Sequence, residues 1–220
     1  MKNNTGNSPQ WDAATEAIRT AQKILVVSHV SPDGDAIGSS LGLANALQQM
    51  GKDVTVANDD GVPPFLRWLP GAEDIVTEVT SGEFDLMIST DSSDEIRTGK
   101  VGAYGRAHSA KVINLDHHPT NTFFGDIYLV VPTTVSATEI VFDWWQHAGI
   151  EIHREIAIPL LTGLVTDTNG FRVSAVTART LQIAQALMQY GASLTEVTAR
   201  TLHTMTYDEF ILWKQILPTA

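Results

Sequence analysis

Residues 23–51 read KILVVSHVSPDGDAIGSSLGLANALQQMG, which is a short apolar run, a polar turn and a longer helix-like segment in succession. Lys23–Ser28 is continuously apolar between its first and last residues, a pattern typical of a strand that is buried on both faces. Ala36–Met50 has helical spacing and stops at Gly51, a residue suited to ending a helix. A buried strand followed directly by a helix is the unit from which parallel sheets are built.

The same alternation continues along the chain. Asp53–Ala57, Asp85–Ser89 and Lys111–Leu115 are further predicted strands. Helical patterns cover Ser136–Gln146, His153–Val165 and Thr177–Met188. Pro159 predicts a kink or a later start in the second of these helices. Together these segments predict an α/β fold with a parallel sheet covered by helices, in which ligands bind beyond the carboxyl ends of the strands.

The length and composition fit one large domain or a small pair of domains. The chain has 220 residues, of which 43% are hydrophobic, and it contains no cysteine. The lack of cysteine excludes disulfides and thiolate metal sites, so a bound metal would be held by oxygen and imidazole, as suits Mg(II), Mn(II), Fe(II) or Zn(II). No apolar run approaches the roughly 20 residues of a membrane span, and the polar start is no signal peptide, so we expect a cytoplasmic protein without membrane contact.

The charge balance restricts the partners. With 14 basic and 25 acidic residues, the formal net charge is −11. Long nucleic acids bind through many basic contacts to phosphates, so we expect short nucleotides as partners and no binding to long DNA. The pair Trp144-Trp145 lies in a helical pattern, which predicts core packing rather than a platform for stacking bases.

Carboxylates and imidazoles follow the ends of the predicted elements. His29, Asp33 and Asp35 lie in one turn after the first strand, where Gly34 lets the backbone bend between the two aspartates. The residues that follow later elements are Asp91, Asp116, His117, His118 and Asp167. Because the carboxyl ends of parallel strands meet at one edge of the sheet, the sequence predicts a metal site there.

Each of these residues also has a structural interpretation. Asp33 and Asp35 could be turn and N-cap residues, and Asp91 could cap the segment after it. His117 and His118 could be a solvated pair, and Asp167 could stabilise a helix-ending turn. These interpretations leave unexplained why all the residues follow element ends.

Four ordered segments resemble the four motifs of the DHH phosphoesterase superfamily. They are His29–Ser39, Asp91–Arg97, Asp116–His118 and Gly163–Asp167. The details resemble most the group of RecJ-like oligoribonucleases and phosphoadenosine-phosphate phosphatases. Further matches to that group are Pro119, Phe171 and the connector Pro63–Gly71. The resemblance implies a Rossmann-like parallel sheet flanked by helices.

The resemblance also implies two divalent ions, of which Mn(II) is the first expectation and Mg(II) and Fe(II) the alternatives. Asp91 would bridge the two ions. His29 and Asp33 would complete one set of ligands. The other set would be Asp35, His117 and Asp167.

Three further residues take roles by the same resemblance. His118 would face the substrate phosphate and act with Asp91 in catalysis. Asp116 would orient the neighbouring imidazole from outside the metal site. Arg97 is expected to clamp the phosphate, although it could be only a solvated arginine after a turn.

The implied activity is manganese-dependent hydrolysis by a phosphodiesterase or phosphatase. The substrate would be a short oligoribonucleotide cut from an end by 3′–5′ exonuclease action, or a nucleotide with a 3′-phosphate. One alternative is pyrophosphate or polyphosphate hydrolysis within the same superfamily. The other is a nucleotide-binding module that binds metal without turnover.

Members of this group usually continue into a C-terminal substrate-binding domain with a Gly-Gly-Gly-His-like motif, which this sequence lacks. We therefore expect a polar leader at residues 1–14 and a DHH-type catalytic domain at residues 15–192. Residues 193–220 would form terminal helices leading toward the missing domain. A homodimer is an assembly that the sequence leaves open.

Overall fold

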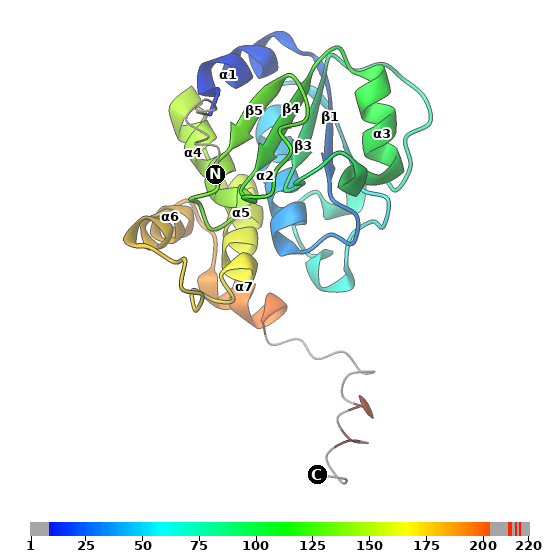
Figure 1. Ribbon diagram of the computed structural model, residues 1–220. Helices are drawn as coiled ribbons and strands as arrows, with labels where there is room; N and C mark the ends of the chain where they lie inside the picture. Colours follow the sequence, from blue (N-terminus) through cyan, green and yellow to red (C-terminus); the bar gives the residue numbers. More distant parts are fainter. Residues whose placement is uncertain (1–8, 203–210, 213, 215, 217–220) are drawn as a thin grey trace.

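The computed structural model describes residues 9–202 together with 211, 212, 214 and 216 (Figure 1). Its centre is a five-stranded sheet in the order β2-β1-β3-β4-β5, and all neighbouring strands are parallel. The strands are β1 (Lys23–Ser28), β2 (Asp53–Ala57), β3 (Leu86–Thr90), β4 (Val112–Asp116) and β5 (Ile127–Val130). The predicted Rossmann-like parallel sheet is confirmed.

Helices cover both faces of the sheet unequally. They are α1 (Trp11–Thr20), α2 (Gly34–Gln49), α3 (Gly99–His108), α4 (Ala137–Ala148), α5 (Arg154–Asp167), α6 (Ala178–Gln189) and α7 (Leu194–Thr201). Three short 3-10 helices are η1 (Pro64–Leu66), η2 (Ala72–Asp74) and η3 (Ile96–Thr98). Ile24 and Val26 of β1 join the large core shared with α1, α2, α4 and α5, whereas Leu25 and Val27 face the smaller cluster beneath α3. This two-sided burial explains the unbroken apolar run of β1.

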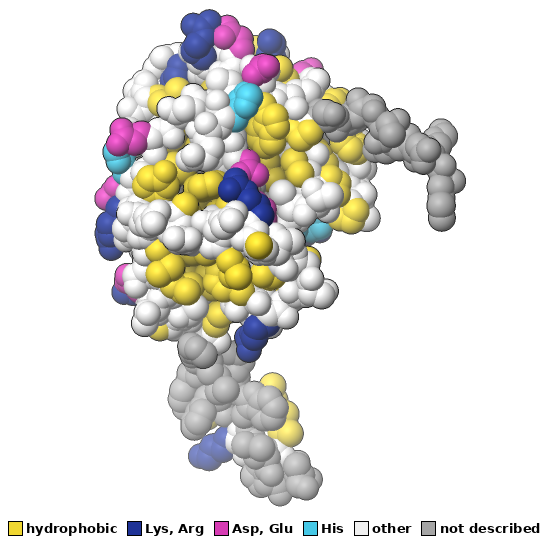
Figure 2. All heavy atoms as spheres, turned by 90° about the vertical axis from the view of Figure 1, so that its left-hand side faces the viewer, with side chains coloured by type: hydrophobic (Ala, Val, Ile, Leu, Met, Phe, Trp, Pro, Cys, Tyr) yellow, Lys and Arg dark blue, Asp and Glu magenta, His cyan; other side chains and the backbone are white. Residues whose placement is uncertain are grey.

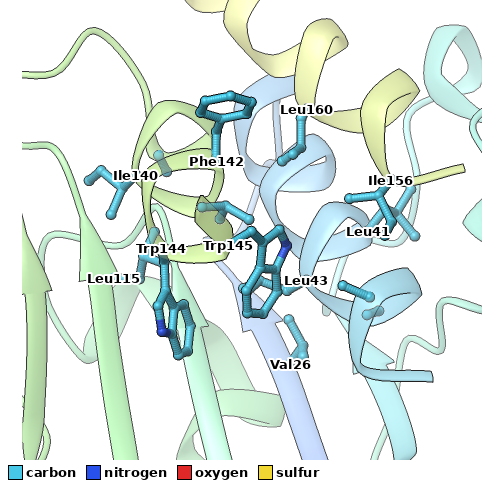
Figure 3. Packing of buried hydrophobic residues seen from close by; sticks show 14 of the residues in the cluster. Val26, Leu41, Leu43, Leu115, Ile140, Phe142, Trp144, Trp145, Ile156 and Leu160 are labelled. Carbon is cyan, nitrogen blue, oxygen red and sulfur yellow. The ribbon is translucent and has the colours of Figure 1, made fainter. Parts of the chain in front are cut away.

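The two tryptophans of α4 belong to the large core. Trp144 and Trp145 are fully buried, and Figure 3 shows them between α4 and the sheet, near Val26 and Leu115. The Trp145 indole N–H donates to the carbonyl of Gly42 at 3.3 Å. The Trp144 indole N–H likewise has a partner, the Thr15 hydroxyl, at 3.1 Å. Their predicted role in packing is confirmed, and neither ring is available for a nucleobase.

Helices α2 and α5 pack with their backbones close together. A Cβ added to Gly38 of α2 would lie 2.5 Å from the carbonyl oxygen of Pro159 in α5. One added to Gly42 would lie 2.4 Å from Cδ2 of Leu160, and one added to Gly34 would lie 2.3 Å from Oγ1 of Thr166. Gly34, Gly38 and Gly42 therefore form a surface of α2 without side chains, here called the seam, against which α5 packs.

Helix α5 begins at Arg154 and continues through Pro159, so it does not begin after the proline. A proline inside a helix deprives the carbonyl four residues earlier of its usual donor. That carbonyl belongs to Glu155, and it accepts a hydrogen bond from Nδ2 of Asn45 in α2 at 2.9 Å. A side chain of the neighbouring helix thus replaces the missing backbone bond.

The expected domain boundaries differ from those in the structure. The expected leader reached residue 14, but α1 begins at Trp11 and buries Ala14 completely, because its apolar face packs on the core. At the other end, α7 packs against α5 and buries Val197. Of the terminal helices expected at residues 193–220, positions 203–210, 213, 215 and 217–220 lie outside the described residues. Among the residues that are described, no helix has the length and hydrophobicity to cross a bilayer.

The outer surface of α6 carries exposed apolar side chains among polar ones. Figure 2 shows hydrophobic side chains gathered on this side of the molecule. Leu181 and Met188 are about half exposed there, and they line a shallow groove together with Phe171. Ile183 and Leu187 point inward from the same helix, which therefore carries apolar side chains on two faces.

Candidate metal centre

The carboxyl ends of β1 and β3 form the floor of the candidate site. β1 and β3 are neighbours, and the order of the strands along the chain reverses between them. This reversal is where open α/β sheets place their ligands. His29 follows β1 directly and Asp91 follows β3 directly. The N–H of Val30 donates to the carbonyl of Arg97 at 2.7 Å, which ties the two loops together.

The first turn of α2 holds two of the candidate carboxylates. Asp33 is the N-cap, and its Oδ1 accepts from the N–H groups of Asp35 and Ala36 at 2.9 and 3.0 Å. The capping interpretation is therefore right for Asp33, but the same Oδ1 lies 3.9 Å from Nε2 of His29. Gly34 is not the expected bend, because it is already helical; a side chain there would collide with Thr166.

Asp35 is held by the start of another helix. Its Oδ2 and Oδ1 accept hydrogen bonds from the backbone N–H groups of Ala137 and Thr138, at 2.6 and 3.0 Å, at the N-terminus of α4. A helix N-terminus stabilises negative charge. Even so, complete burial, followed by repulsion from Asp91 and Asp167, raises the pKa of Asp35 well above its ordinary value. Bound cations would offset this repulsion.

Asp91 lies between two groups of ligands. Its Oδ2 is 3.5 Å from Nε2 of His29, and its Oδ1 is 3.5 Å from Nε2 of His117. Oδ1 is buried and has no hydrogen-bond partner among the described residues. Burial raises the pKa of Asp91, but the close contacts with His117 and His29 outweigh it and hold that pKa far below its ordinary value.

The backbone of Asp91 is strained. Its φ of +51° lies in the left-handed region, which costs energy for any residue other than glycine. The Asp91 N–H donates to the carbonyl of Leu115 in β4 at 2.9 Å, which helps to hold the residue in this conformation. Strain of this kind is concentrated at functional sites.

His117 and Asp167 complete the cluster from β4 and α5. Nε2 of His117 lies 3.6 Å from Oδ2 of Asp167 and 3.9 Å from Oδ2 of Asp35. Burial lowers the pKa of His117, but Asp91 and the other carboxylates outweigh this effect and raise it to about 10. Burial raises the pKa of Asp167 to about 6.

The ligand atoms form two compact sets. In each set the atoms lie within 4.8 Å of one another. The sets are His29, Asp33 and Asp91, and Asp35, His117 and Asp167. The structure thus brings together all six residues that the sequence predicts as ligands. A third group, Asp91, His117 and His118, shares members with both.

Asp116 contacts His118 rather than His117. The Asp116 side chain is fully buried, and its Oδ1 lies 2.8 Å from Nδ1 of His118. Its Oδ2 accepts from Nδ2 of Asn121 at 2.6 Å. Asn121 is not among the residues singled out from the sequence, because an asparagine in a polar loop has no motif or spacing that distinguishes it.

The structure does not place the side chain of Arg97 in the cluster. Arg97 lies in η3 with an exposed side chain, which makes no hydrogen bond or ion pair to any residue the structure describes. The Asp94 carboxylate accepts from the backbone N–H of Arg97 and so fixes the main chain beside the site. A phosphate-clamping role for Arg97 remains a prediction.

The segment after Asp167 contains a basic residue, Arg172, that was not predicted from the sequence as part of the site. Asn169, Gly170 and Phe171 have φ values of 48°, 69° and 64°, three left-handed residues in succession. This turn directs Arg172 back onto Asn169, where Nε donates to the carbonyl at 2.7 Å and Nη2 to Oδ1 at 2.8 Å. The loop after Asp167 therefore presents an ordered guanidinium.

Several known proteins are similar to this chain in sequence. Residues 23–164 match the family described as "DHH family, N-terminal domain". The chain is 38% identical over 225 residues to the "Bifunctional oligoribonuclease and PAP phosphatase NrnA" of Thermus thermophilus. The aligned region covers 98% of this chain and 66% of that protein. It is 30% identical over 153 residues to the "Probable manganese-dependent inorganic pyrophosphatase" of Streptococcus mutans, which covers 66% of this chain and 48% of that protein.

A solved structure shares the fold. The crystal structure of an "exopolyphosphatase-related protein" from Bacteroides fragilis matches with a TM-score of 0.88 at 31% identity, covering 94% of this chain and 64% of that one. The chain spans between 59% and 66% of the length of the first curated relatives that it matches.

Proposed function

This chain belongs to the DHH family, and on that premise we propose that it is a metal-dependent phosphoester hydrolase acting on short nucleotides. The substrate is a short oligoribonucleotide cut from one end, or a nucleotide with a 3′-phosphate. The oligoribonuclease and phosphatase named for the Thermus relative supports this class of substrate. The acidic chain, with a net charge of −11, suits short nucleotides better than long polyanions.

One observation carries the proposal: Asp91 offers a different oxygen to each of the two ligand sets. Its Oδ2 faces His29 and its Oδ1 faces His117, both at 3.5 Å. A carboxylate in this position suits a bridge between two cations. The buried Oδ1 without a partner fits the same role, because an unpaired buried carboxylate oxygen is costly.

The chemistry of the ligands fits two divalent ions. Every candidate ligand is a carboxylate or an imidazole, which suits Mn(II), Mg(II) or Fe(II). The manganese named for the pyrophosphatase relative favours Mn(II). When bound, the pair of ions would supply an activated water and stabilise negative charge on the phosphoryl oxygens. His29 and Asp33 would hold one ion with Asp91.

The protein itself orients the groups around the reacting phosphate. The N-terminus of α4 fixes Asp35 through two backbone N–H bonds, so that carboxylate keeps one orientation in the second ligand set. Asp116 accepts a hydrogen bond from Nδ1–H of His118 and raises the pKa of the ring, so the protonated ring can donate a hydrogen bond or proton from Nε2 to the phosphate or leaving oxygen. Burial of Asp91 and Asp35 keeps competing water from these ligands.

A second candidate is hydrolysis of pyrophosphate or polyphosphate. The pyrophosphatase of Streptococcus mutans and the exopolyphosphatase-related protein of Bacteroides fragilis both support it. The higher identity to the Thermus relative favours the nucleotide substrates instead.

One assay series separates these functions. The chain is incubated with Mn(II) and diadenylate, a five-residue RNA, phosphoadenosine phosphate or pyrophosphate, and the products are separated by chromatography. We expect mononucleotides or orthophosphate from the nucleotide substrates. Release from pyrophosphate alone would establish the second candidate. Binding of nucleotide by calorimetry without product over hours would contradict both and indicate a binding module.

A further inference from the structure

The connection between β4 and β5 is unusual. Parallel strands are ordinarily joined by a crossover of a dozen or more residues that contains a helix. Here residues 117–126 join the two strands without a helix or strand of their own. The loop nevertheless carries His117 and His118, which the proposed function requires to be accurately placed. Hydrogen bonds within the loop and to neighbouring segments must therefore fix its shape.

Asn121 makes three of these bonds. Its Nδ2 donates to Oδ2 of Asp116 at 2.6 Å and to the carbonyl of Ser92 at 3.2 Å. Its Oδ1 accepts from the N–H of Phe123 at 2.6 Å. The side chain is 92% buried, since only 8% of its surface is exposed, so water competes little for these bonds.

Asp116 links Asn121 to His118. A carboxylate bonded through one oxygen alone retains freedom to rotate about its terminal torsion, which has broad minima. In Asp116 both oxygens are engaged, Oδ2 by Asn121 and Oδ1 by Nδ1 of His118 at 2.8 Å. The carboxylate oxygen accepts from Nδ1–H, which selects the tautomer that carries its proton on Nδ1 and leaves Nε2 facing away from Asp116.

Asn121 also connects the two loops that carry the site. The carbonyl of Ser92, one residue after Asp91, accepts from Asn121, and the carbonyl of Ser93 accepts from the N–H of Thr122 at 2.8 Å. The loop after β4 is thus fastened to the loop after β3.

We propose that Asn121 is a positioning residue, which fixes Asp116 and through it the orientation and tautomer of His118. This inference rests on the proposed function, in which His118 contacts the substrate phosphate. Asn121 itself touches no ligand set. Its loss should therefore slow the chemical step while leaving metal binding intact.

The chain offers a matched control in Asn114. Its Nδ2 donates to the same Ser92 carbonyl at the same distance of 3.2 Å, and its side chain is fully buried. Among the described residues, the Asn114 side chain makes no hydrogen bond to Asp116. Asn114→Ala therefore removes a comparable buried bond without releasing the carboxylate.

The kinetic test compares Asn121→Ala with Asn114→Ala in Mn(II). For Asn121→Ala we expect kcat to fall about 10–100-fold, the usual cost of losing an outer partner of a site, while KM stays within about threefold. Asn114→Ala should keep kcat within about threefold of the unsubstituted chain. In a His118→Ala background, adding Asn121→Ala should lower kcat no further. An equal loss in both single variants, or additive losses in the double variant, would overturn the proposal.

Two measurements do not depend on turnover. Calorimetry should give Mn(II) affinities for Asn121→Ala within about threefold of the unsubstituted chain. In Mg(II)-loaded protein labelled with ¹⁵N-histidine, and at a pH high enough for the ring to be neutral, His118 should be the Nδ1–H tautomer in the unsubstituted chain and in Asn114→Ala, but mixed in Asn121→Ala. An unchanged His118 spectrum in Asn121→Ala refutes the positioning role.

The His118 spectrum tests the positioning role of Asn121 even if no tested substrate is hydrolysed. Failure of the proposed function can therefore be told apart from failure of this inference. If Asn121→Ala does not fold, Asn121→Asp keeps an acceptor for the Phe123 N–H and exchanges the donor to Asp116 for an oxygen that repels the Asp116 carboxylate. The same kinetic loss and mixed tautomer are expected for it, and their absence would count against the proposal.

Discussion

Substituting Gly38 by alanine should displace α5 and weaken one half of the metal centre. The added Cβ would lie 2.5 Å from the carbonyl oxygen of Pro159, whereas such carbon–oxygen contacts are ordinarily about 3.3 Å or longer. Because the obstacle is backbone, α5 must move by about 0.8 Å, the difference between these distances. Helix α5 ends at Asp167, and α2 begins beside Asp35, so the seam sets the spacing of these two ligands.

The size of the effect follows from two opposing terms. Overpacking costs about 1–3 kcal/mol, and replacing glycine by alanine within a helix returns about 0.5–1 kcal/mol. We expect a net destabilisation of about 0–2.5 kcal/mol, which lowers Tm by up to about 10 °C in a protein of this size. Metal sites tolerate errors of only about 0.2 Å in ligand distance, so the ion held by Asp35, His117 and Asp167 should bind about 10-fold more weakly or worse.

Titration calorimetry with Mn(II) and thermal unfolding test this reasoning. Gly42→Ala is the matched control, because its Cβ meets Cδ2 of Leu160, a side-chain end that can rotate, rather than backbone. We expect the control to lose stability but to keep both ions. If Gly38→Ala binds two ions with unchanged affinities, the seam does not set the ligand spacing.

Four further outcomes are expected. Asp91→Asn, which keeps the shape but removes the charge shared by both ligand sets, should lower Mn(II)-dependent turnover by at least about 100-fold in a steady-state assay; full turnover would disprove the bridging role. Mn(II) binding should weaken from pH 8 downward and more steeply below about 6, because a proton competes with the ion at His117, whose pKa is raised to about 10, and at lower pH also at Asp167, whose pKa is raised to about 6; calorimetry at pH 5 to 8 would show no such slope if these groups were not ligands. Adding Mn(II) at about 100 times its Kd to chelator-treated protein should stabilise it by about 2.7 kcal/mol and raise Tm in a thermal scan, whereas an unchanged Tm would exclude specific binding to the folded chain. Asn45→Ala leaves the Glu155 carbonyl without its donor and should cost about 1–3 kcal/mol in denaturant unfolding; a neutral result would mean that water replaces the amide.

The parallel sheet and the ligand cluster could be predicted because both produce recognisable patterns in short stretches of the sequence. Lys23–Ser28 is apolar without interruption since both faces of β1 are covered, and polar residues follow it directly. Helix α3 has a weaker helical pattern in the sequence, because Gly99, Gly102 and Gly105 lower its helical propensity. Gly105 allows close packing on the sheet, since a Cβ there would lie 2.7 Å from Sδ of Met87.

Other features depend on contacts between distant segments, which no local pattern encodes. The bond between Asn121 and Asp116 forms only once the loop after β4 has folded back on itself. The four-residue spacing of Gly34, Gly38 and Gly42 was visible in the sequence, but its partner helix was not. The predicted cytoplasmic location and homodimer remain predictions.

The order of the ligands along the chain has a consequence for biosynthesis. His29 emerges early from the ribosome, whereas Asp167, in the last turn of α5, emerges 138 residues later. At bacterial or eukaryotic elongation rates this interval is roughly 7–28 s. Throughout that time the nascent chain lacks one ligand of the second set, however much of the sheet has already paired. Capture of the second cation is therefore expected to close the maturation of this domain rather than to initiate its folding.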